Sequence, residues 1–217
     1  MRTSAMGVSA IGAAAAAMLA GGSSALAGDN TWAETGDAGQ TIGTAQQTLG
    51  LGSLQVLTGV LDGRNDVDIF CIHITDEALF RAQVTSFAGQ DSILWLFNPD
   101  GTLQVANDDF GGGALSTITS QGVFSNGIYY LGVSRFANIP LNAANASLLT
   151  NTFWPGPDFQ QIRGNANILD HWNNGTSPGN VGGAYSITLR GAEFCPTPGA
   201  AALLGLGGLV AGRRRRA

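Results

Sequence analysis

Lysine is absent from this chain of 217 residues, and charged residues of every kind make up only 12% of it. A phosphate-binding loop of the usual form is excluded, because that loop needs a lysine to reach the phosphates. Surface α-helices are not expected either, since they are normally rich in Glu, Lys and Ala. Two cysteines cannot form a structural zinc site, and the two histidines, His73 and His171, are not spaced as zinc ligands.

The chain is instead rich in glycine, with 32 residues, and in Asn, Gln, Ser and Thr, which favours short strands joined by tight turns. Apolar runs of strand length alternate with Asp-Gly, Asn-Gly and Gly-Gly turn dipeptides, which favour hairpins. We expect strands at residues 55–61, 67–74, 80–87, 92–97, 102–106, 115–120, 128–135 and 184–190. About eight short strands without an amphipathic helix predict an all-β fold, an antiparallel β-sandwich.

The alternation of apolar and polar residues predicts which face of each strand is buried. In strand 67–74 (VDIFCIHI), Phe70, Ile72 and Ile74 share the core face, and Cys71 therefore lies on the outer face. In strand 184–190, Tyr185, Ile187 and Leu189 point into the core. The run SILWLF at 92–97 is apolar on both faces, so we expect this strand to be central or covered.

A secretion signal is predicted at the N-terminus. Arg2 supplies the positive charge, residues 6–20 form the apolar core, and an Ala-x-Ala cleavage site ends at Ala27. Residues 28–53, which follow, are polar and glycine-rich, and we expect an extended lead-in with little core of its own. Secretion would place the protein in an oxidising compartment, where two cysteines can pair.

Cys71 and Cys195 are the only cysteines, and the sequence leaves three states open for them. A disulfide between them would join an early strand to the end of the last one and stabilise the fold by a few kcal/mol. Alternatively, Cys195 is a processing or lipidation point, or both cysteines are free thiols. We expect the disulfide.

The body of the protein is strongly acidic once its two ends are set aside. Five arginines remain there against fifteen acidic residues, a formal net charge of −10 (5 − 15). Such a body repels nucleic acid and anionic lipid, so neither is expected as a partner. It attracts cations, among them Ca²⁺.

The C-terminal tail combines a proline motif, an apolar run and an arginine cluster. The run from Ala200 to Gly212 has 13 residues and would span about 20 Å as a helix, against a hydrocarbon core of about 30 Å. It is short for a permanent anchor, so we expect only transient membrane insertion. The arginine cluster that follows the run would stay on the cytoplasmic side. Its members are Arg213, Arg214, Arg215 and Arg216.

This order of elements resembles the PEP-CTERM class of bacterial sorting signals, and we assign it to residues 196–217. The motif is Pro196-Thr197-Pro198, with Thr197 where that class has Glu. The resemblance implies that a membrane transpeptidase, an exosortase, cuts at this motif and passes the protein to the outside. The implied location is the cell surface or the extracellular space of a bacterial envelope. A simple anchor and a soluble amphipathic segment are the alternatives.

A second resemblance lies in the body, over residues 54–195. The segments VLTGVLDGRNDVDIFCIHI, DSILWLFNPDGTLQVANDD, NGIYYLGVS and GAYSITL follow in an order similar to that of bacterial pre-peptidase C-terminal domains. The resemblance implies a jelly-roll-like β-sandwich that is not itself catalytic. Some members of that family bind Ca²⁺ or extracellular polymers, so the resemblance implies either kind of ligand here.

Residues 136–183 interrupt the strand pattern and form a long insertion with several aromatic residues. A loop of this length in a compact domain needs a reason. One interpretation is that its aromatics pack over an exposed sheet face near Trp95 and Phe97. The other is a binding surface for a polysaccharide or another envelope polymer; its residues would be Trp154, Phe159 and Trp172.

Acidic residues precede and follow several predicted strands, and the second resemblance places them near one another at one end of the sandwich. The candidate Ca²⁺ ligands are Asp66, Asp68, Asp91, Asp108 and Asp109. Ca²⁺ accepts six to eight oxygen ligands from irregular loops. The alternative is that these aspartates accept hydrogen bonds from backbone N–H groups in turns.

Residues 175–179 match the hydrolase pattern G-x-S-x-G, with Ser177 at its centre. That motif requires a strand before the serine and a helix after it, and here both flanks are Asn- and Gly-rich. We therefore expect no catalytic residues. The sequence predicts an exported, surface-sorted, non-enzymatic β-sandwich with a structural or adhesive role. The alternative is a polymer-binding module that uses the insertion aromatics with or without Ca²⁺.

Overall fold

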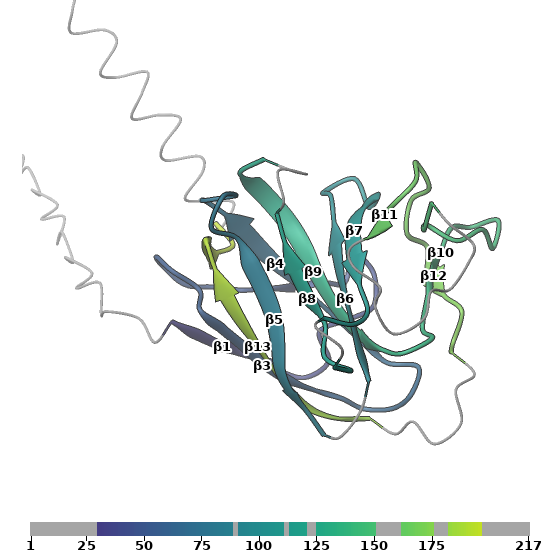
Figure 1. The fold of residues 1–217 in the computed structure, drawn as a ribbon, viewed down its shortest axis with the longest axis horizontal. Helices are drawn as coiled ribbons and strands as arrows, with labels where there is room; N and C mark the ends of the chain where they lie inside the picture. The colour runs from purple at the N-terminus through teal and green to yellow at the C-terminus, as the bar shows by residue number, and fades with distance from the viewer. Residues whose placement is uncertain are drawn as a thin grey trace, which may run out of the picture.

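The fold is described from a computed structural model that covers residues 30–88, 91–110, 113–120, 125–150, 162–175 and 182–196. These residues form fourteen β-strands and no helix. The strands make two large sheets and a small two-stranded ribbon (Figure 1). The predicted all-β sandwich is confirmed.

The five-stranded sheet has the order β1–β3–β13–β5–β8. Its strands are β1 (Thr31–Ala33), β3 (Val56–Leu61), β13 (Gly183–Arg190), β5 (Arg81–Phe87) and β8 (Thr117–Thr119). The seven-stranded sheet has the order β11–β7–β6–β9–β4–β14, and β2 also pairs with β4. Its strands are β11 (Ile162–Arg163), β7 (Leu103–Asn107), β6 (Ser92–Phe97), β9 (Gly127–Arg135), β4 (Val67–Ile74), β14 (Ala192–Phe194) and β2 (Gln46–Gln47). The ribbon pairs β10 (Pro140–Leu141) with β12 (His171–Trp172).

The eight strands expected from the sequence are all present, with ends that shift by at most two residues. The segment expected as an extended lead-in adds a strand to each sheet. Strand β1 pairs in parallel with β3, and β2 pairs in parallel with β4, so both sheets are mixed. Ala38 and Thr48 in this segment are fully buried, so it belongs to the sandwich.

Only one of the turn dipeptides joins two strands in a hairpin. The turn at residues 98–101 connects β6 to β7, with Gly101 at a φ of 85° and its N–H donated to the carbonyl of Asn98. The Asp-Gly turn after β3 instead leads from one sheet to the other, and β8, the next strand after β7, also lies in the other sheet. The expectation of hairpins there was wrong, because local turn chemistry does not specify which sheet the next strand joins.

One continuous apolar cluster, the inter-sheet core, fills the space between the two sheets. The residues predicted to point inward all lie in it: Phe70, Ile72, Ile74, Tyr185, Ile187 and Leu189. Residues that alternate with them on β13 are more exposed, as expected for a strand with one buried face.

A second apolar cluster, the outer core, lies on the opposite face of the seven-stranded sheet. The sheet contributes Ile69, Ile93, Trp95 and Phe97, and the insertion contributes Leu148, Leu149, Leu169 and Trp172. All six residues of β6 are buried, which confirms the prediction of a covered strand. Cys71 lies on the predicted face but is only 1% exposed, because this face is covered as well.

Trp172 is the aromatic residue that joins the insertion to the sheet. Its ring meets Trp95 edge-on with centroids 5.5 Å apart and Phe97 with centroids 6.2 Å apart. Its Nε1 donates a hydrogen bond of 2.7 Å to the carbonyl of Gln40. The insertion therefore packs over the sheet, as the first interpretation predicts for this residue.

We predict that Trp172→Ala lowers the free energy of unfolding by about 3–5 kcal/mol, because the substitution leaves a cavity in the outer core. Urea denaturation of the full chain measures this change. Ile168→Ala is the matched control, since Ile168 is 56% exposed, and it should change the free energy by less than about 0.5 kcal/mol. Equal stabilities of Trp172→Ala and wild type would contradict the packing role.

Candidate functional site

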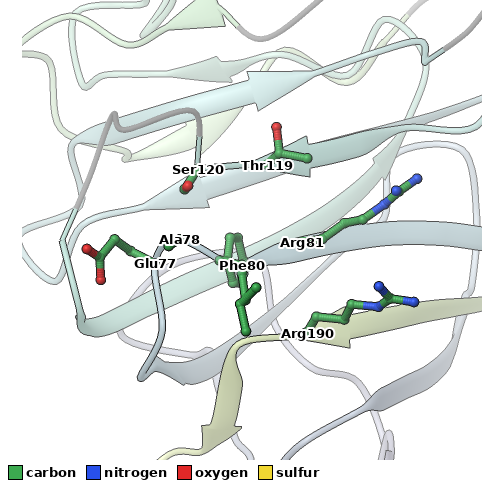
Figure 2. A pocket seen from close by; sticks show the side chains of 8 residues that line it. Glu77, Ala78, Phe80, Arg81, Thr119, Ser120 and Arg190 are labelled. Atoms are coloured by element: carbon green, nitrogen blue, oxygen red, sulfur yellow. The ribbon is translucent and has the colours of Figure 1, made fainter.

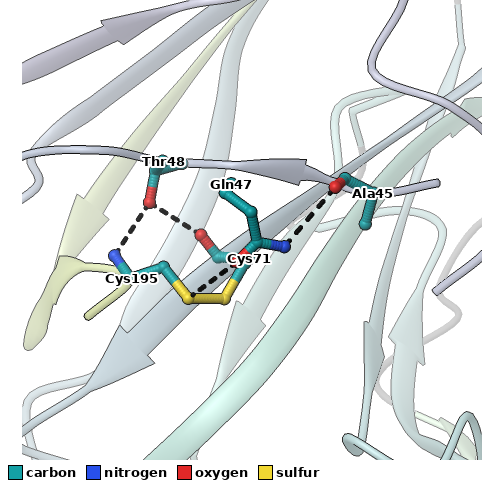
Figure 3. The surroundings of a disulfide bond; sticks show 5 residues. All are labelled: Ala45, Gln47, Thr48, Cys71 and Cys195. Atoms are coloured by element: carbon teal, nitrogen blue, oxygen red, sulfur yellow. Dashed lines mark hydrogen bonds between the residues drawn. A yellow bond between two sulfur atoms is a disulfide. The ribbon is translucent and has the colours of Figure 1, made fainter. Parts of the chain in front are cut away.

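The disulfide between Cys71 and Cys195 joins β4 to the residue that follows β14 (Figure 3). Their Cα atoms lie 5.6 Å apart across a sequence separation of 124. The Thr48 hydroxyl donates to the Cys71 carbonyl at 2.7 Å and accepts from the Cys195 N–H at 3.0 Å. The predicted pairing is confirmed, and a bridged Cys195 has no thiol left for modification.

The bridge lies directly before the proline motif. Pro196 is exposed and is the last residue of the chain that the structure describes. Thr197, Pro198 and the four arginines Arg213 to Arg216 lie outside the described residues, as does Ala27 at the predicted signal cleavage site. Among the described residues there is no helix of the length and apolarity that a membrane crossing needs.

The five candidate Ca²⁺ ligands divide into two groups. Asp68 lies with Glu34 and Asp37, and their carboxylate oxygens are within 4.8 Å of one another. Asp66 lies beside this group and accepts hydrogen bonds from the N–H groups of Asp62 and Val67. Asp66 therefore has the turn geometry that the alternative interpretation predicts.

Asp68 is fully buried at the start of β4, and its Oδ2 accepts a hydrogen bond of 2.7 Å from the Tyr185 hydroxyl. Its Oδ1 is buried and has no hydrogen-bond partner among the described residues. Burial raises the pKa of Asp68 to about 8; the Tyr185 hydrogen bond opposes this shift and the charge of Glu34 adds to it. Glu34 itself accepts from the N–H groups of Ala38 and Val60.

The second group consists of Asp91, Asp108 and Asp109, whose carboxylate oxygens also lie within 4.8 Å of one another. Asp91 directly precedes β6, and the other two directly follow β7, so the antiparallel pairing of these strands brings them to one sheet end. Asp108 is only 2% exposed. The Oδ1 atoms of Asp91 and Asp108 are buried and lack a hydrogen-bond partner within the described part of the chain.

Three carboxylates this close repel one another, and burial adds to the cost of keeping them ionised. Burial, and then the charges of Asp91 and Asp109, raise the pKa of Asp108 to about 8. Burial and the charge of Asp109 raise the pKa of Asp91 to about 6. A bound proton or a bound cation would reduce this repulsion between the carboxylates.

The donor set fits Ca²⁺, which prefers carboxylate oxygens in irregular loops. Asp91, Asp108 and Asp109 would hold it, and the unpaired Oδ1 atoms of Asp91 and Asp108 are oxygens that turn hydrogen bonds leave free. The Glu34 group fits less well, because four of its six carboxylate oxygens already accept hydrogen bonds, three from backbone N–H groups and one from the Tyr185 hydroxyl. Bound Ca²⁺ would supply positive charge at this end of the sandwich.

Glu34 and Asp37 were not predicted as site residues, because the sequence placed them in an extended lead-in with little core of its own. They reach Asp68 because β1 adds to the edge of the five-stranded sheet in parallel with β3. The available signal was the short segment ETGDAG, in which two acidic residues flank a turn. Parallel pairing between two strands that are near in sequence could not be read from that segment.

The aromatic and hydrolase candidates are placed only in part. Trp172 is 4% exposed, so its ring does not face a ligand, and Trp154 and Phe159 lie outside the described residues. Ser177 also lies outside them. Nδ1 of His171 lies 2.9 Å from Oδ2 of Asp170, and its Nε2 lies 3.0 Å from Oδ1 of Asn145.

We predict that, with EGTA present, the free energy of unfolding falls as the pH rises from 5 to 8. Folded Asp68 and Asp108 hold a proton up to a pKa of about 8, whereas an unfolded aspartate releases it near 3.9. The folded state thus binds more protons over this range, so stability is present at low pH and is lost as the pH rises. Urea titrations at both pH values measure the change, expected to be on the order of a few kcal/mol.

At pH 8, CaCl₂ at about 100 times its Kd should raise the free energy of unfolding by about 2.7 kcal/mol. Asp108→Asn should remove most of this gain and raise the stability of the Ca²⁺-free protein at pH 8. Asp100→Asn is the matched control, because Asp100 is an exposed turn residue that accepts from Thr102. No effect of CaCl₂ on wild type would contradict a metal site.

No known protein-family model matches this chain, and no curated protein matches it.

Proposed function

We propose that this protein is exported and held at the bacterial cell surface as a non-catalytic β-sandwich with a structural or adhesive role. An exosortase-like transpeptidase is its processing partner in this proposal. The observation that carries the proposal is the disulfide between Cys71 and Cys195 at the base of the tail. Disulfides persist in oxidising compartments outside the cytosol, which agrees with export.

The position of the bridge suits a domain held by its C-terminus. Strand β14 has three residues and stands at the end of its sheet, where it pairs with β4 and has a single bridge to Ser53 on its other side, so a pull on the tail would otherwise peel it away. With Cys195 bonded to Cys71, the pull enters β4, which is paired along eight residues with β9. The sandwich then resists the load as one unit.

The non-catalytic part of the proposal is supported by the surroundings of His171. Its two ring nitrogens contact a carboxylate and an amide on the outer loops, an arrangement that holds a loop in place. The unpaired carboxylate oxygens at Asp91 and Asp108 suit cation binding by geometry and charge. They support Ca²⁺ as a structural ion.

A polymer-binding module is the second candidate function. Burial of Trp172 argues against a surface built on that residue. A polymer surface would then rest on other residues, with Ca²⁺ stabilising the fold at a distance. The observation that favours this candidate is a groove on the five-stranded sheet, described in the next subsection.

We predict that intact-mass spectrometry of the protein from its native host finds a chain that begins at Gly28 and ends within the motif at residues 196–198. Its mass should be two hydrogens below that of the reduced chain, because Cys71 and Cys195 are bridged. Reduction should restore the two hydrogens, and subsequent alkylation should replace them with a label on each cysteine. A secreted chain that still carries Arg213 to Arg216 would contradict sorting at the tail.

A further inference from the structure

Two arginines lie directly opposite each other on the outer face of the five-stranded sheet. Arg81 opens β5, Arg190 closes β13, and the register pairs them across the two strands. Their neighbours Ala82 and Leu189 point into the inter-sheet core, so the guanidinium groups point outward. Figure 2 shows both side chains running in the same direction from adjacent strands.

Like charges directly opposite on neighbouring strands destabilise a sheet. In the described part of the chain, neither guanidinium forms an ion pair, although the protein has fifteen acidic residues. The Nε–H of Arg81 is buried without a hydrogen-bond partner among the described residues. Glu77 lies at the far end of the same hollow, and its carboxylate points away from both arginines (Figure 2).

The arginine pair lies at the centre of a groove that crosses several strands. Three adjoining hollows of about 510, 190 and 600 Å³ are all lined by Arg190, and two of them are lined by Arg81. They extend from Thr119 on β8 across β5 and β13 to Val56 on β3. A groove that crosses four adjacent strands of a sheet suits an extended chain better than a compact ligand.

The groove offers two kinds of contact besides the guanidinium groups. Hydroxyl and amide side chains line it, among them Gln55, Gln83, Thr119 and Thr188. Apolar side chains stand at its sides: Leu79 is 66% exposed, and Phe110 is 41% exposed with its ring centroid 5.4 Å from Cζ of Arg81. Hydroxyls and amides suit sugar hydroxyls, and the apolar side chains suit the flat faces of sugar rings.

The planar guanidinium fork matches the two oxygens of a carboxylate. The rest of the body carries a large excess of acidic residues, so its net charge repels a densely charged polyanion. A polymer that carries one carboxylate on each sugar offers an oxygen pair to each guanidinium and is less densely charged than a polyphosphate or polysulfate. We propose that the groove centred on Arg81 and Arg190 binds a linear, carboxylate-bearing polysaccharide.

The proposal deepens the adhesive role proposed above by naming its partner class, and it rests on that role for its biological meaning. Binding itself requires neither export nor sorting. A purified protein that fails to bind would overturn the groove and leave the mass-spectrometric test of export untouched. A chain that binds but is not sorted would overturn the proposed location and leave the groove intact.

The test is affinity electrophoresis of the full chain through polygalacturonate, followed by titration calorimetry with oligogalacturonates. EGTA is present throughout, because Ca²⁺ could bridge two sets of carboxylates. We expect retardation of wild type, and a loss of affinity of about tenfold or more in the double variant Arg81→Gln with Arg190→Gln. Arg163→Gln is the matched control, since Arg163 is exposed and lies on β11 of the other sheet, and its affinity should stay within about twofold of wild type.

Thermal unfolding separates a lost ligand contact from a lost fold. The melting temperature of the double variant should equal or exceed that of wild type, because the substitutions remove a like-charge pair. Failure of wild type to bind polygalacturonate would overturn the proposal, as would an equal loss in Arg163→Gln. Equal affinity for neutral dextran, for dextran sulfate or for duplex DNA would also overturn it, since the groove would then not recognise carboxylated sugars.

Discussion

Strand β6 carries large apolar side chains on both of its faces, and both faces must be covered for the protein to fold. Leu94 and Leu96 pack into the inter-sheet core, while Ile93, Trp95 and Phe97 pack into the outer core. One cover is the five-stranded sheet, and the other is the insertion with Trp172. The insertion is therefore structural where the structure describes it, and within the described residues the outer face of the five-stranded sheet has no such cover.

The pairing of the strands in the two sheets also sets the positions of the acidic cluster and of the arginine pair. Antiparallel pairing of β6 with β7 brings Asp91 to Asp108 and Asp109, where burial raises the pKa values of the first two. The outer face of the other sheet pairs Arg81 with Arg190. Among the described residues, the acids at a sheet end and the arginines on a sheet face are thus held apart, and neither group neutralises the other. A cation and an anionic polymer are the partners that such a separation suits.

The sequence allowed the strands to be predicted well, because alternation and turn residues act locally. The eight strands and the covered β6 followed from such patterns, whereas the Cys71–Cys195 pairing was expected because these are the only two cysteines of a chain with a predicted secretion signal. The sheet assignments did not, since the Asp-Gly turn after β3 leads across the sandwich instead of into a hairpin. Glu34 and Arg190 were missed as site residues for the same reason. Each gains its neighbours by strand pairing that the local sequence does not specify, Glu34 beside Asp68 and Arg190 beside Arg81.

The disulfide has a consequence for the covalent continuity of the molecule. Residues 71 to 195 form a closed covalent loop that contains most of the sandwich and the whole insertion. A protease that cuts the backbone once anywhere in that loop leaves both pieces bonded through Cys71 and Cys195. The nicked protein therefore stays attached to its C-terminus, whereas a reduced one would release the part before the cut. For the exported protein proposed above, the bridge would keep a nicked molecule joined to its tail.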